Sequence, residues 1–510
     1  MLSRSNALKA NAKTAALALM LALCAGMLGG CSSQLEERAM TDISQIPIAV
    51  QQLAPVEDTI ADGKARVMLY FLSADGSRLV PVSREIDVPG GVSTARAALQ
   101  ALLGGPNEHE NGTWPDLGLP IVARSMEISG GVAVVDLPAR VRTLSQETLY
   151  GMRVAIACTL TEFADIDAVN VLIGGREEGL DLGATFPVGT LQRTADLDLG
   201  ASFARLEGLR QAGGAFEQMV TLYLPTADGR FVLPQVFSID YAQMTPIEYL
   251  YTLLDVLGTE AGGGVGFASI PAPMMFINEM PEIVRTDDGA YRAIEIQFEA
   301  ALDEALAASG LTREIYLAML THTLMGAVPG VEGLKVHIGD EVISSLSAQQ
   351  TRDGRAFSFA QGLATRDDFV SCIGAPVTVY AIDGETGGLV AEERVLAHEK
   401  SRSPRALLET LVAMWGDRAA TSALTGADIL AVGVDGEEIA VNLSATFADA
   451  LRALDEREAK AAVYAMVNTL TQNRLRGNVT FFFDGVQMEE PLGGIEMRGS
   501  LTRNPGMVVD

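Results

Sequence analysis

The sequence has few of the residues from which metal sites and cofactor sites are built. It contains four histidines and four cysteines in 510 residues. The histidines, His109, His322, His337 and His398, are scattered along the chain, and none has a second metal ligand at helical spacing. We therefore expect no metal ion and no other cofactor.

The cysteines are too few for a disulfide framework. Cys24 and Cys31 lie in the N-terminal segment, which leaves Cys158 and Cys372 for the rest of the chain. Cys158 falls in the apolar face of an expected helix, and Cys372 comes just before an expected strand. We predict that both are buried free thiols, and a bridge between them is the alternative.

Motifs of catalysis are also missing. No lysine has a serine three residues before it, and neither a Gly-x-Ser-x-Gly elbow nor a Gly-Lys-Ser/Thr phosphate loop occurs. The glycine cluster at 262–266 follows an expected helix, where a flexible turn is more typical than a phosphate cradle. We expect no catalytic residue, and hence no enzyme, although a glycosidase pair of distant carboxylates is an alternative that spacing does not test.

Positive charge is scarce. The chain has 37 lysines and arginines against 65 aspartates and glutamates, for a formal net charge of −28. Such a chain repels nucleic acid and anionic lipid, and we exclude both as partners. We interpret the acidity as a source of solubility outside the cell.

Long hydrophobic runs are absent, with one exception at the N-terminus. Three cations, Arg4, Lys9 and Lys13, precede an apolar run at 15–28 that ends at Gly29-Gly30-Cys31. The run falls short of the roughly 20 residues that a permanent span needs. It predicts a signal peptide over residues 1–30, and the residues before Cys31 resemble the lipobox of bacterial lipoproteins.

The lipobox implies a diacylglycerol on Cys31. Two acyl chains are enough for stable membrane attachment. We therefore expect the mature chain at the outer face of the bacterial cytoplasmic membrane, on a tether over residues 31–64. An ordinary cleaved signal peptide and an uncleaved anchor are the alternatives.

Three segments of the chain repeat. They align on tyrosines about 155 residues apart, a period too long for a solenoid and typical of whole-domain triplication. The aligned segments are 67–72 with Tyr70, 220–224 with Tyr223 and 377–381 with Tyr380.

Each copy shows the same order of signals. A strand, an Asp-Gly turn and a second strand come first. A helix then follows a capping residue, which is Thr94 in the first copy, Thr245 with Glu248 in the second and Ser403 before a proline in the third. A second hairpin turns at 130–131, 288–289 and 435–436. A second amphipathic helix ends in Thr-Leu at 159–160, 323–324 and 469–470, and a last strand follows.

This order predicts an α/β fold of the two-layer sandwich type, in three tandem repeats of strand-strand-helix-strand-strand-helix-strand. The return strand of each second hairpin carries one polar residue near its end: Asp136, Gln297 or Asn442. Because the three side chains differ, we interpret them as solvent-facing positions and not as a shared catalytic group.

Several short motifs in the sequence resemble those of a known protein family. The Leu-Tyr-Phe strand at 69–71, the helix end Leu-Leu-Gly-Gly-Pro at 102–106, the Val-Val-Asp strand at 134–136 and the Thr-Leu at 159–160 resemble the GerMN domain of the GerM sporulation and spore germination lipoproteins. A Pro-x-Gly tail at 187–189 recurs at 491–493, and the second copy lacks it. The resemblance covers residues 65–190, 218–340 and 375–498, called copy one, copy two and copy three below.

The connecting segments at 190–217 and 341–374 show some helical pattern, notably Leu206, Leu209 and Phe216. We expect short helices there that dock one copy on the next, and an end-to-end array of the three copies.

The resemblance implies a structural or assembly component that acts in sporulation or germination through protein partners or self-association. A lipoprotein that binds envelope polymer or a small ligand for a sensor or transporter is the alternative. Both readings rest on likeness of fold, which does not fix function.

Overall fold

The computed structural model describes residues 63–509 except for short gaps at 90–91, 182–184, 195–196, 213–215, 242–243, 261–265, 286–291, 416–420, 436–437 and 475–476. The expected signal peptide, Cys31 and nearly all of the tether lie outside the described residues, as do most of the glycine cluster at 262–266 and the turn at 288–289. Among the helices that the structure describes, none is long and apolar enough to cross a membrane.

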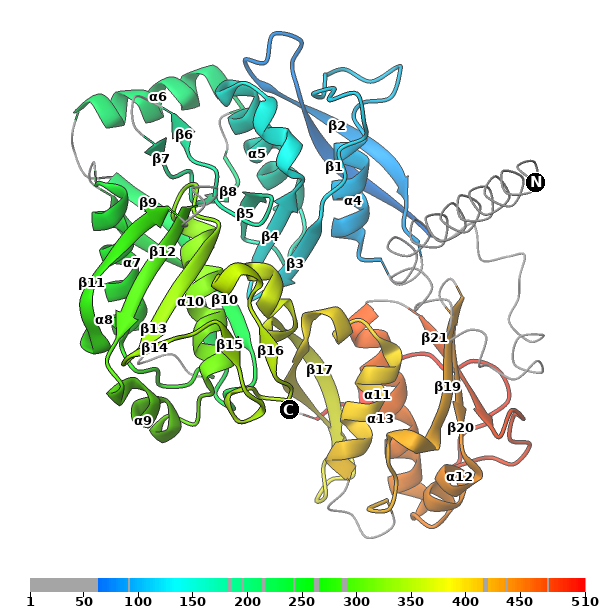
Figure 1. Ribbon diagram of the computed structural model, residues 1–510. Coiled ribbons are helices and arrows are strands. Elements are labelled where there is room, and N and C mark those ends of the chain that lie inside the picture. The colour runs from blue at the N-terminus through cyan, green and yellow to red at the C-terminus, as the bar shows by residue number, and fades with distance from the viewer. Residues whose placement is uncertain are drawn as a thin grey trace, which may run out of the picture.

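Copy one has the expected order of elements (Figure 1). They are β1 (Lys64–Leu72), β2 (Leu79–Asp87), α4 (Thr94–Leu103), β3 (Ser125–Ser129), β4 (Val132–Leu137), the 3-10 helix η1 (Ala139–Thr143), α5 (Gln146–Leu160) and β5 (Ala168–Ile173). The segment that follows holds β6 (Leu180–Asp181), β7 (Thr185–Phe186), β8 (Thr190–Gln192) and α6 (Leu199–Ala212).

Copy two repeats the order with two added short helices. Its elements are β9 (Phe216–Pro225), β10 (Val232–Tyr241), α7 (Pro246–Glu260), α8 (Pro273–Phe276), β11 (Ile277–Arg285), β12 (Arg292–Phe298), α9 (Ala301–Ala308), α10 (Arg313–Ala327) and β13 (Gly333–Ile338). Then come β14 (Glu341–Val342), β15 (Ser345–Leu346), β16 (Phe357–Ser358) and the 3-10 helices η2 (Ala348–Gln350), η3 (Ala360–Gly362) and η4 (Arg366–Cys372).

Copy three follows directly. Its elements are β17 (Gly374–Ile382), β18 (Leu389–Ala397), α11 (Pro404–Met414), β19 (Ile429–Asp435), β20 (Glu438–Leu443), α12 (Ala445–Arg452), α13 (Glu456–Arg474) and β21 (Asn478–Phe483). The 3-10 helices are η5 (His398–Lys400), η7 (Gly426–Asp428) and η8 (Pro505–Met507). The chain is thus built of three tandem repeats of one α/β unit.

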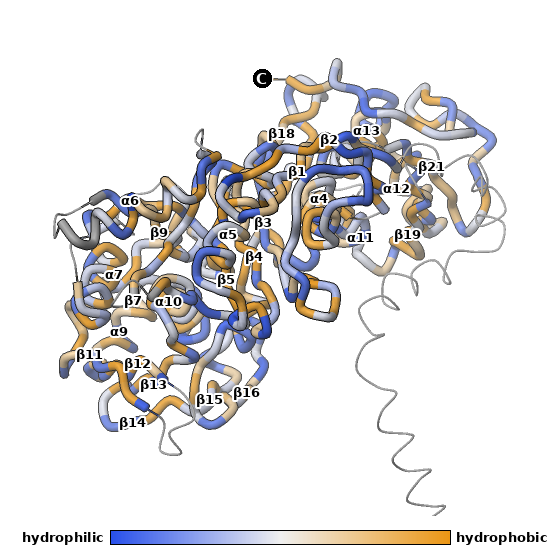
Figure 2. The backbone as a smooth tube through the Cα atoms, turned by 90° about the horizontal axis from the view of Figure 1, so that it is seen from above, coloured by the Kyte–Doolittle hydropathy of each residue, from blue (hydrophilic) through white to orange (hydrophobic). Residues whose placement is uncertain are grey.

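The sheets have the same topology in each copy. The first two strands form an antiparallel hairpin of their own, and the second hairpin and the last strand form a sheet in the order β3-β4-β5-β8, β11-β12-β13-β14 or β19-β20-β21. In that sheet β4 pairs antiparallel with β3 and parallel with β5, and copies two and three repeat this pattern. Figure 2 shows the hydrophobic colour concentrated on strands such as β4 and on the helices packed near them.

The helix starts follow from their capping residues. Ser403 accepts a hydrogen bond from the Ala406 amide, and Thr245 and Glu248 form a reciprocal capping box, as predicted. In copy one the prediction of Thr94 was wrong by one residue: the cap is Ser93, whose Oγ accepts from the Arg96 amide at 3.2 Å, and Thr94 is the first helical residue. Ser and Thr cap equally well, so sequence alone does not choose between neighbours.

The second helices of copies one and two are buried more completely than an amphipathic pattern predicts. In copy one every residue from Leu149 to Leu160 is buried, because the sheet lies against one side of α5 and β1 against another. In copy two every residue from Glu314 to Ala327 is buried. A helix that is buried on all sides has no polar face, so its sequence does not alternate between polar and apolar residues with a period of 3.6.

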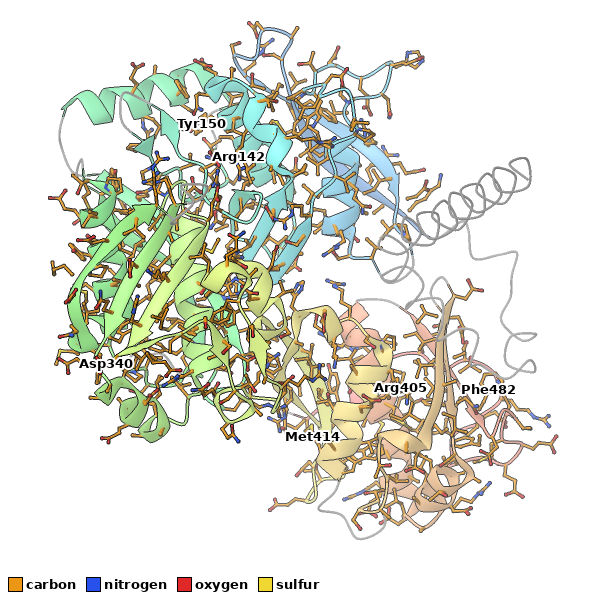
Figure 3. All side chains as sticks on the ribbon, in the orientation of Figure 1. Arg142, Tyr150, Asp340, Arg405, Met414 and Phe482 are labelled. Atoms are coloured by element: carbon orange, nitrogen blue, oxygen red, sulfur yellow. The ribbon has the colours of Figure 1, made fainter. Side chains whose placement is uncertain are left out.

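The end-to-end array that we expected is not what the structure shows. Copies one and two share one continuous hydrophobic cluster, in which Val134 and Leu172 from the sheet of copy one join Leu222 and Leu320 of copy two. Copy three has a separate core around Trp415. Figure 3 shows this division, with Tyr150 in the upper part of the molecule and Arg405 and Phe482 in the separate lower part.

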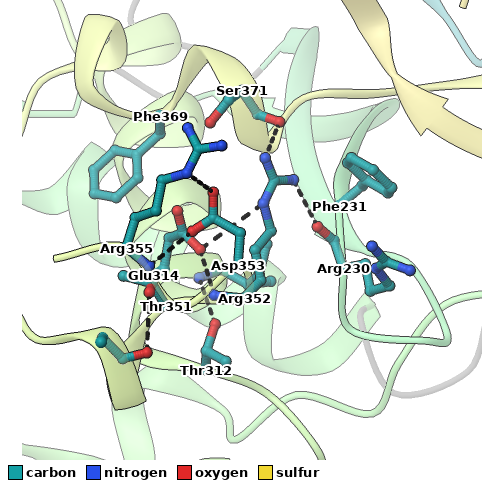
Figure 4. A network of polar contacts seen from close by, with 12 residues as sticks. Arg230, Phe231, Thr312, Glu314, Thr351, Arg352, Asp353, Arg355, Phe369 and Ser371 are labelled. Atoms are coloured by element: carbon teal, nitrogen blue, oxygen red, sulfur yellow. Dashed lines mark hydrogen bonds and ion pairs between the residues drawn. The ribbon is translucent and has the colours of Figure 1, made fainter. Parts of the chain in front are cut away.

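The segments between copies differ from the expectation in part. Helix α6 does contain Leu206 and Leu209, but Phe216 begins strand β9. The segment 341–374 forms short strands and 3-10 turns in place of short helices. Its Arg352 packs over the ring of Phe231, and the backbone amide of Arg352 donates to Glu314 at 2.8 Å (Figure 4), so this segment belongs to copy two.

Candidate functional site

One hydrogen bond recurs in all three copies. Near the end of each second helix, a threonine hydroxyl accepts from the backbone amide of the aligned tyrosine in the first strand. The three pairs are Thr159 with Tyr70 at 3.1 Å, Thr323 with Tyr223 at 2.9 Å and Thr469 with Tyr380 at 3.0 Å. The bond fixes the first hairpin on the helix.

Replacing Thr469 by valine is expected to destabilise copy three by about 1–3 kcal/mol, because the shape is kept while the buried Tyr380 amide loses its acceptor. Denaturant unfolding followed through Trp415, in a Trp114→Phe background, measures the loss. The matched control is Thr410→Val, whose hydroxyl only donates to the Ala406 carbonyl one turn earlier in its own helix. Equal losses in the two variants would contradict the assignment.

An arginine completes the recurring set. The segment after each last strand pairs with that strand through Leu191, Ala364 or Leu501. The arginine two residues further donates to the tyrosine hydroxyl: Arg193 to Tyr70 at 3.2 Å, Arg366 to Tyr223 at 3.2 Å and Arg503 to Tyr380 at 2.8 Å. We call tyrosine, threonine and arginine the Tyr-Thr-Arg triplet.

The sequence carried a signal for this arginine that our reading missed. Arg193 and Arg503 each follow their tyrosine by 123 residues. In copy two the separation is 143 residues, because the chain between β13 and Arg366 is longer. The repeated copies therefore share this arginine in addition to the aligned tyrosine and threonine.

The carboxylate that joins the triplet differs from copy to copy. In copy one it is Glu162 of the same copy, which accepts from the Tyr70 hydroxyl at 2.6 Å and lies 2.7 Å from Arg193. In copy two it is Glu127, which comes from strand β3 of copy one. The triplet of copy one thus binds a carboxylate of its own copy, whereas the triplet of copy two binds a carboxylate of copy one.

The contact between copies one and two is a buried polar group that we call the junction cluster: Glu127, Tyr223, His322 and Arg366. These residues are 6%, 1%, 1% and 6% exposed, respectively. Tyr223 donates to Glu127 Oε2 at 3.2 Å, Arg366 Nη2 lies 3.7 Å from the same oxygen, and Arg366 Nη1 donates to the His322 carbonyl at 2.8 Å. A buried ion pair of this kind fixes the relative position of the two copies.

Burial governs protonation in the junction cluster. It raises the pKa of the Glu127 carboxyl, which Arg366 and Tyr223 partly offset. Burial alone would lower the pKa of Arg366, but Tyr223 and Glu127 raise it above its usual value. Burial and the neighbouring Arg366 hold the pKa of His322 well below its usual range, so this imidazole is neutral. Arg366 therefore stays positively charged in the junction cluster, and His322 adds no charge to it.

A second buried pair lies on the same seam. Arg153 on α5 and Glu177 after β5 are 3.5 Å apart, with side chains 1% and 0% exposed. Burial raises the pKa of Glu177. The backbone of Glu177 bonds to Met325 and Gly330 of copy two. The pair within copy one thus lies beside the seam, and the backbone of Glu177 crosses it to copy two.

The prediction that Asp136, Gln297 and Asn442 face solvent was wrong for two of the three. Asp136 is 6% exposed and Asn442 is 2% exposed, while Gln297 is half-buried. Asp136 accepts from the Gly175 amide and Asn442 accepts from the Gly485 amide, both at 2.8 Å. Each side chain holds the turn after the last strand, a role that only an oxygen acceptor can fill.

The cysteine prediction is confirmed. Cys158 and Cys372 are both buried and free. Burial raises the pKa of both thiols, that of Cys372 to about 12. Both therefore stay protonated at neutral pH and are poor nucleophiles.

The histidines are distributed over the molecule and serve different structural roles. His109 is exposed in a loop, His322 belongs to the junction cluster and His337 bonds to Glu295 at 2.8 Å. Over the described ranges, no group of three His, Cys, Asp or Glu side chains could hold a metal ion.

The fourth histidine joins copies one and three. His398, just after β18, accepts at Nε2 from the Ile128 amide of β3 at 3.2 Å. This acceptor must be unprotonated. Burial, with Arg96 and Arg402 nearby, lowers the pKa of His398 to about 4.

The contact through His398 is expected to weaken in acid. Because its folded pKa lies below the unfolded value of about 6.5, the contribution is complete above that pH and is lost as the pH falls towards 4. The loss should be about 3 kcal/mol of unfolding free energy at pH 4 relative to pH 7. Comparing the wild type with His398→Gln across this range isolates it. Parallel pH profiles would contradict the prediction.

These observations define a class: a tandem α/β repeat protein whose copies share a polar triplet, which in copy two binds a carboxylate of copy one. Residues 68–179 and 378–489, within copies one and three, match the family model described as "Germane: Sporulation and spore germination". Copies one and three thus carry segments that match this family of sporulation and spore germination proteins. The family is non-catalytic.

Three solved structures are similar to parts of the chain. The tandem GerMN domains of the sporulation protein GerM from Bacillus subtilis are 16% identical, cover 59% of this chain and 100% of their own, and have a TM-score of 0.21. The first GerMN domain of that protein is 24% identical, with coverages of 26% and 97% and a TM-score of 0.19. A putative lipoprotein from Clostridium perfringens is 22% identical, with 26% and 88% and a TM-score of 0.16. No curated protein matches.

Proposed function

We propose that this chain is an extracytoplasmic lipoprotein, anchored through Cys31, that acts in sporulation or spore germination as a structural or assembly component. It works through protein-protein contacts and not through catalysis. Copy two is a third, more diverged copy of the GerMN domain, because it carries the Tyr-Thr-Arg triplet at equivalent positions.

The observation that carries the proposal is the use of this triplet. In copies one and two, the polar side chains that recur bind a carboxylate of this chain. In copy two they bind a carboxylate of another copy. A domain whose shared polar residues can join it to a neighbour is suited to building assemblies.

Deleting the gene in the source organism tests the role. We expect fewer heat-resistant spores or slower germination, restored by the full chain. Normal values for both would refute the assembly role in this process.

The anchor is tested separately. A fatty-acid probe should label the wild-type chain, and Cys31→Ser should abolish the labelling. Cys24→Ser, which changes the other cysteine of the N-terminal segment, is the matched control and should leave it unchanged. Labelling that persists in Cys31→Ser would refute the anchor without touching the assembly role.

A further inference from the structure

The triplet of copy three has no carboxylate partner among the residues that the structure describes. Arg503 is exposed and donates to Tyr380 at 2.8 Å, with its guanidinium 5.9 Å from the centre of the tyrosine ring. None of the ion pairs found in the described ranges includes Arg503. A charged arginine beside a tyrosine hydroxyl can bind a carboxylate, because both groups donate hydrogen bonds to its oxygens.

One position at or just after the end of the second helix decides where each carboxylate comes from. Three residues after the triplet threonine, copy one has Glu162, which fills the site from within the copy. Copy two has Gly326 at this position, and a Cβ there would lie 3.5 Å from Arg366 and 3.7 Å from Asn170 of copy one. Copy three has Gln472, which is neutral. Among the described residues, the site formed by Tyr380 and Arg503 therefore receives no carboxylate, either from copy three itself or from copies one and two.

A matching carboxylate lies elsewhere on the molecule. Glu127, which fills the site of copy two, stands opposite Val134 on β4, and Val134 pairs in turn with Asn170 on β5. In copy two Glu282 occupies the same register, opposite Glu295, which pairs with Lys335. The same position in copy three is Gly433. Glu282 is thus the one carboxylate at this register that is not already bound by a triplet.

Glu282 is accessible but cannot reach Arg503 of its own chain. It is exposed on β11, an edge strand, next to Met280, which is 65% exposed. Strand β11 lies on the far side of copy two from copy three in both Figure 1 and Figure 2. Its Pro281 and its register shifts hinder pairing with another strand, so a partner must dock through side chains.

We propose that two molecules of this chain associate head to tail, with Glu282 of one bound by Tyr380 and Arg503 of the other. This rests on the proposed assembly role and names its partner, a second copy of the chain. The contact would repeat between molecules the one that Glu127 makes with Tyr223 and Arg366 within the chain. Because the two surfaces differ, the contact does not close on itself and can extend to further molecules.

The residues around Glu282 determine how strongly the two molecules bind. Where copy one presents Val134, copy two presents Glu295, which already pairs with Lys335 and His337. The intermolecular contact is therefore more polar than the internal one, and we expect micromolar association that weakens as salt is raised.

The test is sedimentation of the full chain in density-matched detergent over a range of concentrations. We expect the wild type to associate. Arg503→Glu and Glu282→Arg should each weaken association roughly 30-fold or more, because each removes a charge pair and adds a repulsion. The matched controls are Arg498→Glu and Glu279→Arg, which change exposed residues in the same two segments and should associate like the wild type.

Mixing the two variants separates a lost contact from a damaged fold. A 1:1 mixture of Arg503→Glu and Glu282→Arg restores one intact contact between unlike molecules, so dimers should return. A wild type that stays monomeric, a mixture that stays monomeric, or controls that weaken association equally would overturn the proposal. A monomeric wild type together with a spore defect on deletion would refute the self-association alone, whereas normal spores with intact association would refute the assembly role alone.

Discussion

Replacing Arg366 by methionine is expected to lower the free energy of unfolding of copies one and two by about 3–5 kcal/mol. The substitution keeps much of the side-chain volume but leaves Glu127 buried without its counter-charge. It also leaves the His322 carbonyl without the donor that now lies 2.8 Å away. Denaturant unfolding followed through Trp114, in a Trp415→Phe background, measures the loss.

The matched control for this prediction is Arg355→Met in the same segment. Arg355 pairs with Asp353 at 3.4 Å, but its side chain is 86% exposed, and such pairs contribute little (Figure 4). The double variant Arg366→Met/Glu127→Gln should recover part of the loss, because no unpaired charge then stays buried. Equal stability of Arg366→Met and the control would show that the junction cluster does not hold the copies together.

Replacing Gly189 by alanine is expected to destabilise the seam between copies one and two by about 2–5 kcal/mol. Gly189 has a φ of +73°, and a Cβ there would lie 2.6 Å from the carbonyl oxygen of Met219 on β9 and 2.9 Å from the Gln218 amide nitrogen. The backbone of β9 must move to admit the methyl group. Unfolding followed through Trp114 again gives the change.

Gly76→Ala separates backbone strain from steric conflict. Gly76 has a φ of +70°, nearly that of Gly189, but a Cβ there would meet nothing within 4 Å. We expect a loss of about 1 kcal/mol, from the left-handed conformation alone. If the two alanine variants lost the same stability, the contact between Gly189 and Met219 would have no energetic weight.

The order of elements could be predicted because each element carries its own local signal. The Asp-Gly turns, the capping boxes and the Thr-Leu helix ends lie within a few residues of the structures that they specify. The same signals did not show that copies one and two share a core. The outer-face residues Val134 and Leu172 look like any residues of a buried strand, and only the structure shows that the other copy covers them.

The junction cluster could not be predicted from the sequence, for a related reason. Glu127 and Arg366 are 239 positions apart in the chain, and neither lies in a motif that spacing can reveal. Asp136 and Asn442 misled the reading because different side chains perform one task, the acceptance of a single backbone hydrogen bond. Arg193 and Arg503 were detectable, since each stands 123 residues after its tyrosine.

The shared core of copies one and two has a consequence for how the chain reaches its folded state. Residues from Tyr70 of β1 through Ile373 contribute to one cluster, so the outer face of copy one stays uncovered until the chain is complete as far as η4. During that interval Val134 and Leu172 are open to proteases and to other unfinished chains. Copy three has a core of its own, so its folding does not depend on the other two copies in this way. The first two copies are therefore the part of the chain most open to misfolding while it folds.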